Sequence, residues 1–304
     1  MSDIVELHQI EFHAGRIAKP SWTLNGRFLA VPAESGSIFI VDTQTMQIVQ
    51  TLGPHDGAVT AVGWNREGDF IVSGSLDRTI GVWQVRNGRR VSIVIAGHRE
   101  PLHSIEYTNE GAFAMTCSSD HVRALDGFCL ETGWTKAMEE SVNNYGGFTA
   151  ASCSFNTTLL LALAAKNGER LILLNLLAAE VLSQVDLNAP ARCLAWSQAE
   201  TPLLAVATGQ KILTLPALPE QGFIGSPREL ANDVPPVDAL AFSSNGDLLA
   251  SRDAQGLKVW NVKTGNLVSA LDGSVQTIAF HPSKPLLAAV GGTALRILDL
   301  TKLV

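Results

Sequence analysis

The sequence has no apolar run long enough to cross a membrane. The longest candidate, residues 158–165, has the length of a β-strand, whereas a membrane-spanning helix needs about 18 or more apolar residues. The first residues, Met1, Ser2 and Asp3, do not begin the basic and then apolar pattern of a secretory signal peptide. We therefore expect a cytoplasmic protein with no membrane partner.

Cysteine is scarce, and its spacing matches no metal site. The four cysteines lie at positions 117, 129, 153 and 193, without a close CxxC pair. Cys117, His121 and Cys129 are candidate metal ligands, but their spacing fits no zinc pattern. Cys153 and Cys193 fall in expected strands, where cysteine acts as a small apolar residue. We expect no metal and no other cofactor.

Positive charge is also in short supply. The formal net charge is −7 and the isoelectric point is near 5.5, which argues against a general nucleic-acid partner because phosphate binding needs clustered Lys and Arg. The densest basic group comprises Arg86, Arg89 and Arg90 around one expected turn. We interpret it as a solvated turn, with a local phosphate contact as the alternative.

Common catalytic motifs are missing as well. The sequence contains no P-loop, no GxSxG, no HExxH and no Rossmann glycine fingerprint. His281, Pro282 and Ser283 have the pattern of a turn after a strand rather than of a hydrolytic pair. The sequence therefore predicts a protein that is not an enzyme.

What the sequence does contain is a repeat of aromatic residues spaced 38 to 48 positions apart. Its members are Trp22, Trp64, Tyr107, Phe155, Trp196, Phe242 and Phe280. A period in this range is typical of an array of similar supersecondary units, with the blades of a β-propeller as the leading candidate. A propeller is a platform that hosts many unrelated functions, so the repeat predicts architecture rather than chemistry.

The clearest unit runs from residue 55 to residue 95. Short apolar stretches at 58–64, 70–74, 79–83 and 90–95 alternate with polar turns that contain Gly, Asn and Asp. Four strands this short, at this spacing, indicate all-β packing.

This unit resembles a WD repeat. In the WD-repeat family a His, a Ser, an Asp and a Trp form a hydrogen-bonded chain, and the matching residues here are His55, Ser73, Asp77 and Trp83. A buried indole N–H needs an acceptor, and a linked chain leaves no polar member unsatisfied. Gln84 follows Trp83, so the Trp-Asp pair itself is missing. The other units are weaker copies.

The resemblance implies an all-β, seven-bladed β-propeller with four-stranded blades. We count seven units from about residue 15 to residue 300, and the last unit is one strand short. Residues 3–10 alternate polar and apolar side chains, so we expect this segment to pair with the last blade and close the ring. Because the repeat covers the whole chain, residues 1–304 are expected to form a single domain.

One face of a propeller carries the turns before the first strand and between the second and third strands of each blade, and WD-repeat proteins commonly seat peptides there. Ordinary solvent exposure is the alternative for any residue taken alone, and an extended loop at 216–228 is a second candidate surface. The predicted partner-binding residues are Arg16, Arg99, Glu100, Tyr145, Lys166, Arg252 and, in the loop, Phe223.

The resulting hypothesis is a non-enzymatic interaction scaffold, a subunit of a complex, that binds a protein or peptide partner on the propeller rim or by the extended loop. One alternative is a small-molecule-binding sensor or an enzyme that uses the central channel, where Asp77, Asp120 and Asp253 could converge on a cation. Another is a regulatory subunit of a larger enzyme or defence assembly.

Overall fold

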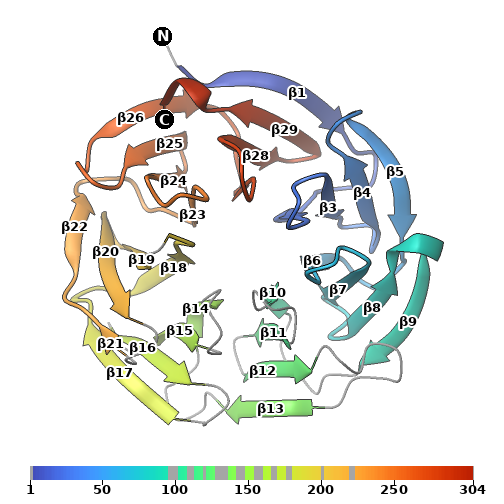
Figure 1. Cartoon of the computed structure of the whole chain (residues 1–304), viewed down its shortest axis with the longest axis horizontal. Helices are drawn as coiled ribbons and strands as arrows, with labels where there is room; N and C mark the ends of the chain where they lie inside the picture. Colours follow the sequence, from blue (N-terminus) through green and yellow to red (C-terminus); the bar gives the residue numbers. More distant parts are fainter. Residues whose placement is uncertain are drawn as a thin grey trace. The chain divides into compact units, whose positions relative to one another are not determined.

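The computed structural model describes residues 3–94, 102–107, 113–118, 121–126, 136–141, 148–153, 160–165, 170–175, 180–199, 202–218 and 223–303. In this part of the chain the strands form seven antiparallel sheets (Figure 1), and the two helical turns are the short 3-10 helices Val85–Asn87 and Thr301–Leu303. The chain divides into two compact units, residues 10–147 and residues 1–9 with 148–304. No helix among the described residues is both long and apolar enough to span a membrane.

The unit of residues 10–147 contains three four-stranded sheets, each built from strands consecutive in sequence. The first sheet comprises β2 (Ser21–Trp22), β3 (Phe28–Pro32), β4 (Ile38–Asp42) and β5 (Gln47–Leu52). The second comprises β6 (Val59–Trp64), β7 (Phe70–Ser75), β8 (Ile80–Gln84) and β9 (Arg89–Val94). The third comprises β10 (Leu102–Tyr107), β11 (Phe113–Ser118), β12 (His121–Asp126) and β13 (Lys136–Ser141).

The other unit contains four sheets. The first two comprise β14 (Phe148–Cys153), β15 (Leu160–Ala165), β16 (Arg170–Asn175) and β17 (Glu180–Asp186), and then β18 (Ala191–Trp196), β19 (Leu203–Thr208) and β20 (Lys211–Leu218), with β21 (Phe223–Ile224) and β22 (Arg228–Ala231) both pairing with β20. The third comprises β23 (Ala239–Phe242), β24 (Leu248–Asp253), β25 (Gly256–Asn261) and β26 (Leu267–Asp272). The fourth comprises β27 (Thr277–Phe280), β28 (Leu286–Gly291) and β29 (Ala294–Asp299).

The fourth strand of this last sheet comes from the beginning of the chain. β1 (Val5–Glu11) pairs with β29, in the place where the other sheets use their own fourth strand. Ile4, directly before β1, is buried in a cluster with Leu298 and Leu300. The alternating segment at residues 3–10 therefore lies beside the last sheet.

Burial falls from the inner strands of a sheet to its outermost strand. Every side chain of β7 is buried, and β3, β19, β24 and β28 are nearly as enclosed. Strands covered on both faces need continuous apolar runs, which explains sequences such as that of β28. The outer strands β1 and β5 are mostly exposed, and half of the residues of β26 are exposed.

Indole groups of the aromatic repeat tie neighbouring sheets together. Trp64 in β6 donates its Nε1–H to the carbonyl of Ser21 at 2.9 Å, and Trp196 in β18 donates to the carbonyl of Ser152 at 2.9 Å. In each case the acceptor belongs to the first strand of the preceding sheet. The tryptophans are almost fully buried, so these bonds satisfy a donor that would otherwise be stranded.

The indole bond to a serine carbonyl shows which residue occupies the repeating aromatic position in the sheet that begins with β14. Ser21 directly precedes Trp22, and Ser152 directly precedes Cys153, so Cys153 takes the place of the aromatic residue in β14. Phe155, which the sequence pattern suggests for that place, lies outside the described residues. A two-residue shift escapes a search for aromatic spacing because Cys153 is small and apolar but not aromatic.

Candidate functional site

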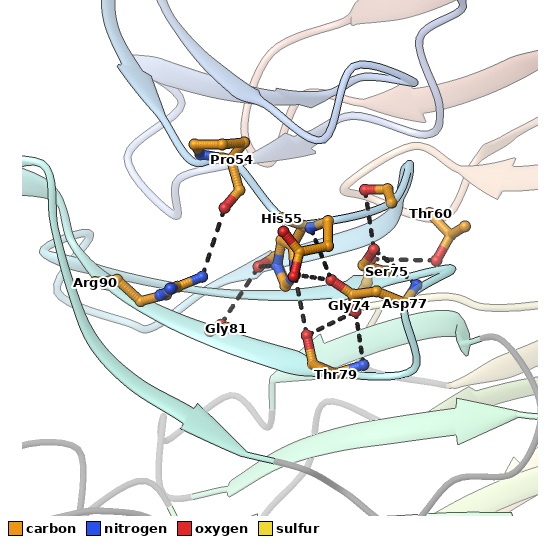
Figure 2. Close-up of polar contacts among 12 residues, drawn as sticks. Pro54, His55, Thr60, Gly74, Ser75, Asp77, Thr79, Gly81 and Arg90 are labelled. Carbon is orange, nitrogen blue, oxygen red and sulfur yellow. Dashed lines mark hydrogen bonds and ion pairs between the residues drawn. The ribbon is translucent and has the colours of Figure 1, made fainter.

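The second sheet contains a chain of buried polar side chains that starts before β6 (Figure 2). Trp83 donates its Nε1–H to Ser73 Oγ at 2.7 Å, and Ser73 Oγ lies 2.7 Å from His55 Nε2. His55 Nδ1 lies 3.1 Å from Asp77 Oδ2. Because the carboxylate can only accept, His55 carries its proton on Nδ1, and Nε2 accepts from the Ser73 hydroxyl. The bonds therefore run in one direction from the indole to the carboxylate.

Asp77 ends the chain and organises the turn between β7 and β8. Its Oδ1 accepts from the backbone N–H of Thr79 at 2.8 Å and from the Thr79 hydroxyl at 2.6 Å. Its Oδ2 also accepts from the backbone N–H of Asp56 at 3.1 Å. Burial opposes ionisation of Asp77, but the bonds from Thr79 and the neighbouring His55 outweigh it and lower the pKa of Asp77 below its ordinary value of 3.8.

His55 is held neutral at physiological pH. Burial is the main cause that lowers the pKa of His55 from its ordinary value of 6.5, and it outweighs the attraction of the Asp77 carboxylate for a protonated ring. The side chain of His55 is 1% exposed. A histidine enclosed in this way, with both ring nitrogens engaged, stabilises the sheet and is closed to a substrate.

The sixth sheet, β23 to β26, also hydrogen-bonds a buried tryptophan and a buried aspartate, but with partly different residues. Trp260 donates its Nε1–H to Ser251 Oγ at 2.8 Å, as Trp83 does to Ser73. Opposite that serine stands Lys258, whereas Gly81 stands opposite Ser73. Lys258 Nζ donates to the buried carboxylate of Asp253 at 2.7 Å. In the second sheet the carboxylate of Asp77 is bound by His55. The sixth sheet has no histidine at that place, and Lys258 on its third strand binds the carboxylate of Asp253 instead.

We expect the free energy of unfolding to decrease as the pH falls below about 7, in part because of His55. The unfolded chain binds a proton at His55 near pH 6.5, whereas the folded protein resists that proton because its pKa is lower. The stability contributed by neutral His55 is therefore complete above the unfolded pKa and is lost as the pH falls toward the folded pKa.

Denaturant unfolding of the wild type and of His55→Gln at a series of pH values measures this contribution. The difference in the free energy of unfolding between the two proteins should be largest at about pH 7.5 and should shrink by about pH 5. The other histidines are present in both proteins, so their contributions cancel in this difference. A difference that stays constant over this range would contradict the role given to His55.

The structure describes only part of the predicted partner-binding set. Arg16 is exposed, and its backbone N–H donates to the carboxylate of Glu34 at 3.0 Å. Phe223 begins β21 and pairs with Leu218, so the stretch expected as a long loop contains a short strand. The predicted residues that lie outside the described residues are Arg99, Glu100, Tyr145 and Lys166.

Arg252, also predicted for partner binding, is fixed within a cluster that the sequence did not reveal. Its Nη1 donates to Asp238 Oδ2 at 2.7 Å and its Nε donates to the carbonyl of Val275 at 2.5 Å. Arg192 donates to the other oxygen, Oδ1, of Asp238 through Nη2 and, at 3.1 Å, through Nε. Arg252 therefore braces neighbouring sheets, and its role toward a partner stays a prediction.

The strand register shows which feature could have identified Arg192 as a candidate surface residue. Arg192 is the extra residue of a β-bulge at the start of β18, and the first strands β6, β10 and β14 carry a bulge at the same place among the described sheets. Asp238 precedes Phe242 by four positions, as Arg192 precedes Trp196. Residues four positions before the repeating aromatic could therefore have been chosen from the sequence as candidate surface residues.

The weaker sequence candidates have local partners. Arg90 donates to the carbonyl of Pro54 at 3.5 Å (Figure 2). Its guanidinium carbon lies 5.4 Å from the Trp83 ring centre. Asp77 and Asp253 each bind donors of their own sheet, whereas Asp120 and Cys129 lie outside the described residues. Within the described part of the chain, no group of three His, Cys, Asp or Glu side chains could hold a metal ion.

Comparisons with known proteins agree with the repeat. Residues 46–84 match the family described as "WD domain, G-beta repeat", a stretch that contains the His55 to Trp83 chain. The crystal structure of the Cps50 (Swd1) β-propeller domain of Myceliophteria thermophila superimposes with a TM-score of 0.81 at 19% identity, covering 98% of this chain and 99% of that one. At this identity the likeness shows the fold alone.

Curated relatives share stretches of sequence with the chain. The transcriptional corepressor LEUNIG_HOMOLOG of Arabidopsis thaliana is 21% identical over 94% of this chain and 30% of its own length. The human F-box-like/WD repeat-containing protein TBL1X is 32% identical over 33% of this chain and 17% of its own length. Cell division cycle 20.4, cofactor of APC complex, of Arabidopsis thaliana is 25% identical over 84% and 58%. The chain thus spans less than two thirds of each of these relatives.

Proposed function

We propose that this chain, a member of the WD-repeat β-propeller family, is a non-enzymatic interaction scaffold that binds a protein or peptide partner. The observation that carries the proposal is the resemblance to relatives named as a corepressor, as an F-box-like/WD repeat-containing protein and as a cofactor of the APC complex. Two of these names describe proteins that act together with other proteins. The chain would accordingly work as a subunit of a complex.

We further propose that the sheets are the blades of one seven-bladed ring formed by residues 1–304. Two observations support this arrangement. Seven sheets lie in the described part of the chain, and β1 pairs with β29 as the fourth strand of the last sheet. Pairing the beginning of the chain with its last strands closes a ring without an open edge, as β-propellers require.

Rigidity is the physical property on which a scaffold of this kind depends. Buried tryptophans tie consecutive sheets together, and the second strands β7 and β19 are enclosed on both faces. A surface fixed in this way loses little conformational entropy when a partner binds. We therefore propose that the partner meets a preformed rim with little rearrangement.

The absence of catalysis remains part of the proposal and is supported by how the candidate acid–base groups are used. His55 and Asp77 are such groups, and their polar atoms bind Ser73, Thr79 and each other. We also propose a cytoplasmic location, no cofactor, and no nucleic-acid or membrane partner, because of the cysteine spacing, net charge and hydropathy of the sequence.

A regulatory subunit of a larger enzyme is the second candidate. The relative named as a cofactor of the APC complex favours it. This reading differs from the first only in what the partner does, because both need a partner-binding surface. Identifying the partner decides between them.

Simultaneous alanine substitution at Arg16, Arg99, Tyr145 and Phe223 should abolish capture of the partner from a lysate. Interfaces concentrate their binding energy in a few Arg and aromatic residues, so we expect two or three of these changes to account for the loss. Quantitative mass spectrometry of proteins captured by wild type and variant measures the effect. Arg252 is left intact because it braces neighbouring sheets.

A matched variant with alanine at Leu24, Arg66 and Lys284 provides the control. These exposed residues lie in turns between first and second strands, at the opposite end of their sheets from the predicted rim. The control should retain every partner at wild-type level. If the rim variant melts like the wild type and also retains every partner, the binding site lies elsewhere.

A further inference from the structure

The cluster of Arg192, Asp238 and Arg252 carries an excess of positive charge at the start of two neighbouring first strands. Two guanidinium groups flank a single carboxylate, in a chain whose formal net charge is −7. The Arg192 side chain is 49% exposed, Asp238 is 38% exposed and Arg252 is 20% exposed. Arg192 is thus the member of the cluster that a partner meets first.

Asp238 uses both of its oxygens to orient the two arginines. Oδ1 accepts from Arg192 and Oδ2 accepts from Arg252. Arg252 is fixed a second time by the bond from its Nε to the carbonyl of Val275. Among the described residues, Nη1 of Arg192 and Nη2 of Arg252 have no hydrogen-bond partner. Donors on both guanidinium groups therefore remain available.

Oriented guanidinium groups with spare donors are suited to oxyanions. Arginine matches the planar geometry of carboxylate and phosphate groups and is less strongly hydrated than lysine. Because Asp238 already holds both side chains in place, an incoming oxyanion would not have to order them. A cationic peptide side chain would meet net repulsion at the same place.

We propose that Arg192 and Arg252, oriented by Asp238, bind an oxyanion carried by a peptide segment of the partner. The oxyanion is the carboxylate of an acidic residue or the phosphate of a phosphorylated one, two groups that the same donors recognise. This inference rests on the proposed scaffold function. It adds the class of partner, an acidic peptide, and a contact that the sequence did not reveal, Arg192.

The test uses the full chain and a library of synthetic peptides that is randomised except at one central position. That position is Glu, phosphoserine, Gln or Ser, so the Glu–Gln and phosphoserine–Ser pairs isolate the charge. Peptides retained by the wild type are measured by fluorescence anisotropy against the wild type, Arg192→Gln and Arg27→Gln. Arg27 forms an ion pair with Asp42 and is 52% exposed, but it lies before β3, at the opposite end of its sheet.

We expect acidic or phosphorylated peptides to bind about tenfold or more tightly than their neutral counterparts. Arg192→Gln should remove most of that difference, whereas Arg27→Gln should leave it intact. The preference should also weaken as salt is added. Comparing the affinities of the Glu peptides and the phosphoserine peptides identifies which oxyanion the site binds.

Three outcomes would overturn the inference. If peptides bind equally well with charged and neutral central residues, the scaffold stands but the acidic partner is wrong. If the charge preference survives in Arg192→Gln, the oxyanion site lies elsewhere on the chain. If no peptide is retained and no protein is captured from lysate either, the proposed function fails together with this inference.

Discussion

Deleting residues 1–10 should cause a large loss of stability and aggregation. The deletion removes all of β1 except Glu11 and leaves backbone N–H and C=O groups of β29 unpaired at an exposed edge, which other chains can extend. It also removes Ile4, which is 7% exposed and packs with Leu298 and Leu300. Loss of a buried isoleucine alone costs about 2–5 kcal/mol. Thermal unfolding and light scattering measure the two effects.

Substitutions in β1 and directly before it separate the contribution of the backbone from that of the side chains. Val5 and Leu7 are 41% and 44% exposed, so replacing both with threonine should leave the melting temperature almost unchanged. Ile4→Ala should fall between this control and the deletion. A deletion variant that melts and remains soluble like the wild type would show that β1 does not close the last sheet.

Gly81→Ala should destabilise the protein by roughly 2–4 kcal/mol, although it adds one methyl group. A Cβ at position 81 would lie 2.8 Å from Trp83 Nε1, 2.9 Å from His55 Nε2 and 3.0 Å from Ser73 Oγ. These three atoms belong to the buried polar chain, so the methyl group must push its members apart. Denaturant unfolding monitored by tryptophan fluorescence measures the loss.

A double-mutant cycle with His55→Ala tests this explanation. Removing the imidazole opens space beside position 81, so Gly81→Ala should cost less in the His55→Ala background than in the wild type. The double variant should therefore lose less stability than the sum of the two single losses, by more than the error of the measurements. Additive costs would mean that Gly81 is required for a reason other than the polar chain.

The repeat pattern carries more information about strands than about which residues fill each position. Alternating short apolar runs and polar turns indicate all-β packing, and the matched positions His55, Ser73, Asp77 and Trp83 lie in hydrogen-bonding contact. Both signals depend on local spacing, which a sequence displays directly. The segment before the first sheet was likewise recognisable because strand alternation is local.

Residues whose role depends on a neighbouring strand or sheet are harder to predict from the sequence. Lys258 reaches the carboxylate of Asp253 because it pairs with Ser251 on the adjacent strand. No sequence motif indicates that pairing. Cys153 takes an aromatic position through a register that spacing alone misplaces by two residues. Arg192 and Asp238 are 46 residues apart and meet through the packing of two sheets. Such contacts follow from tertiary structure rather than from local sequence.

We propose that a partner binds a preformed rim on this chain without being chemically changed. Isothermal titration of the purified protein with the partner identified by capture tests it most directly, using wild type and the variant with alanine at Arg16, Arg99, Tyr145 and Phe223. We expect saturable binding to the wild type, with the partner recovered unaltered. Binding should be weakened by at least about 2 kcal/mol in the variant, whose melting temperature should be unchanged. Equal affinity for both proteins, or turnover of a small molecule by the purified chain, would contradict it.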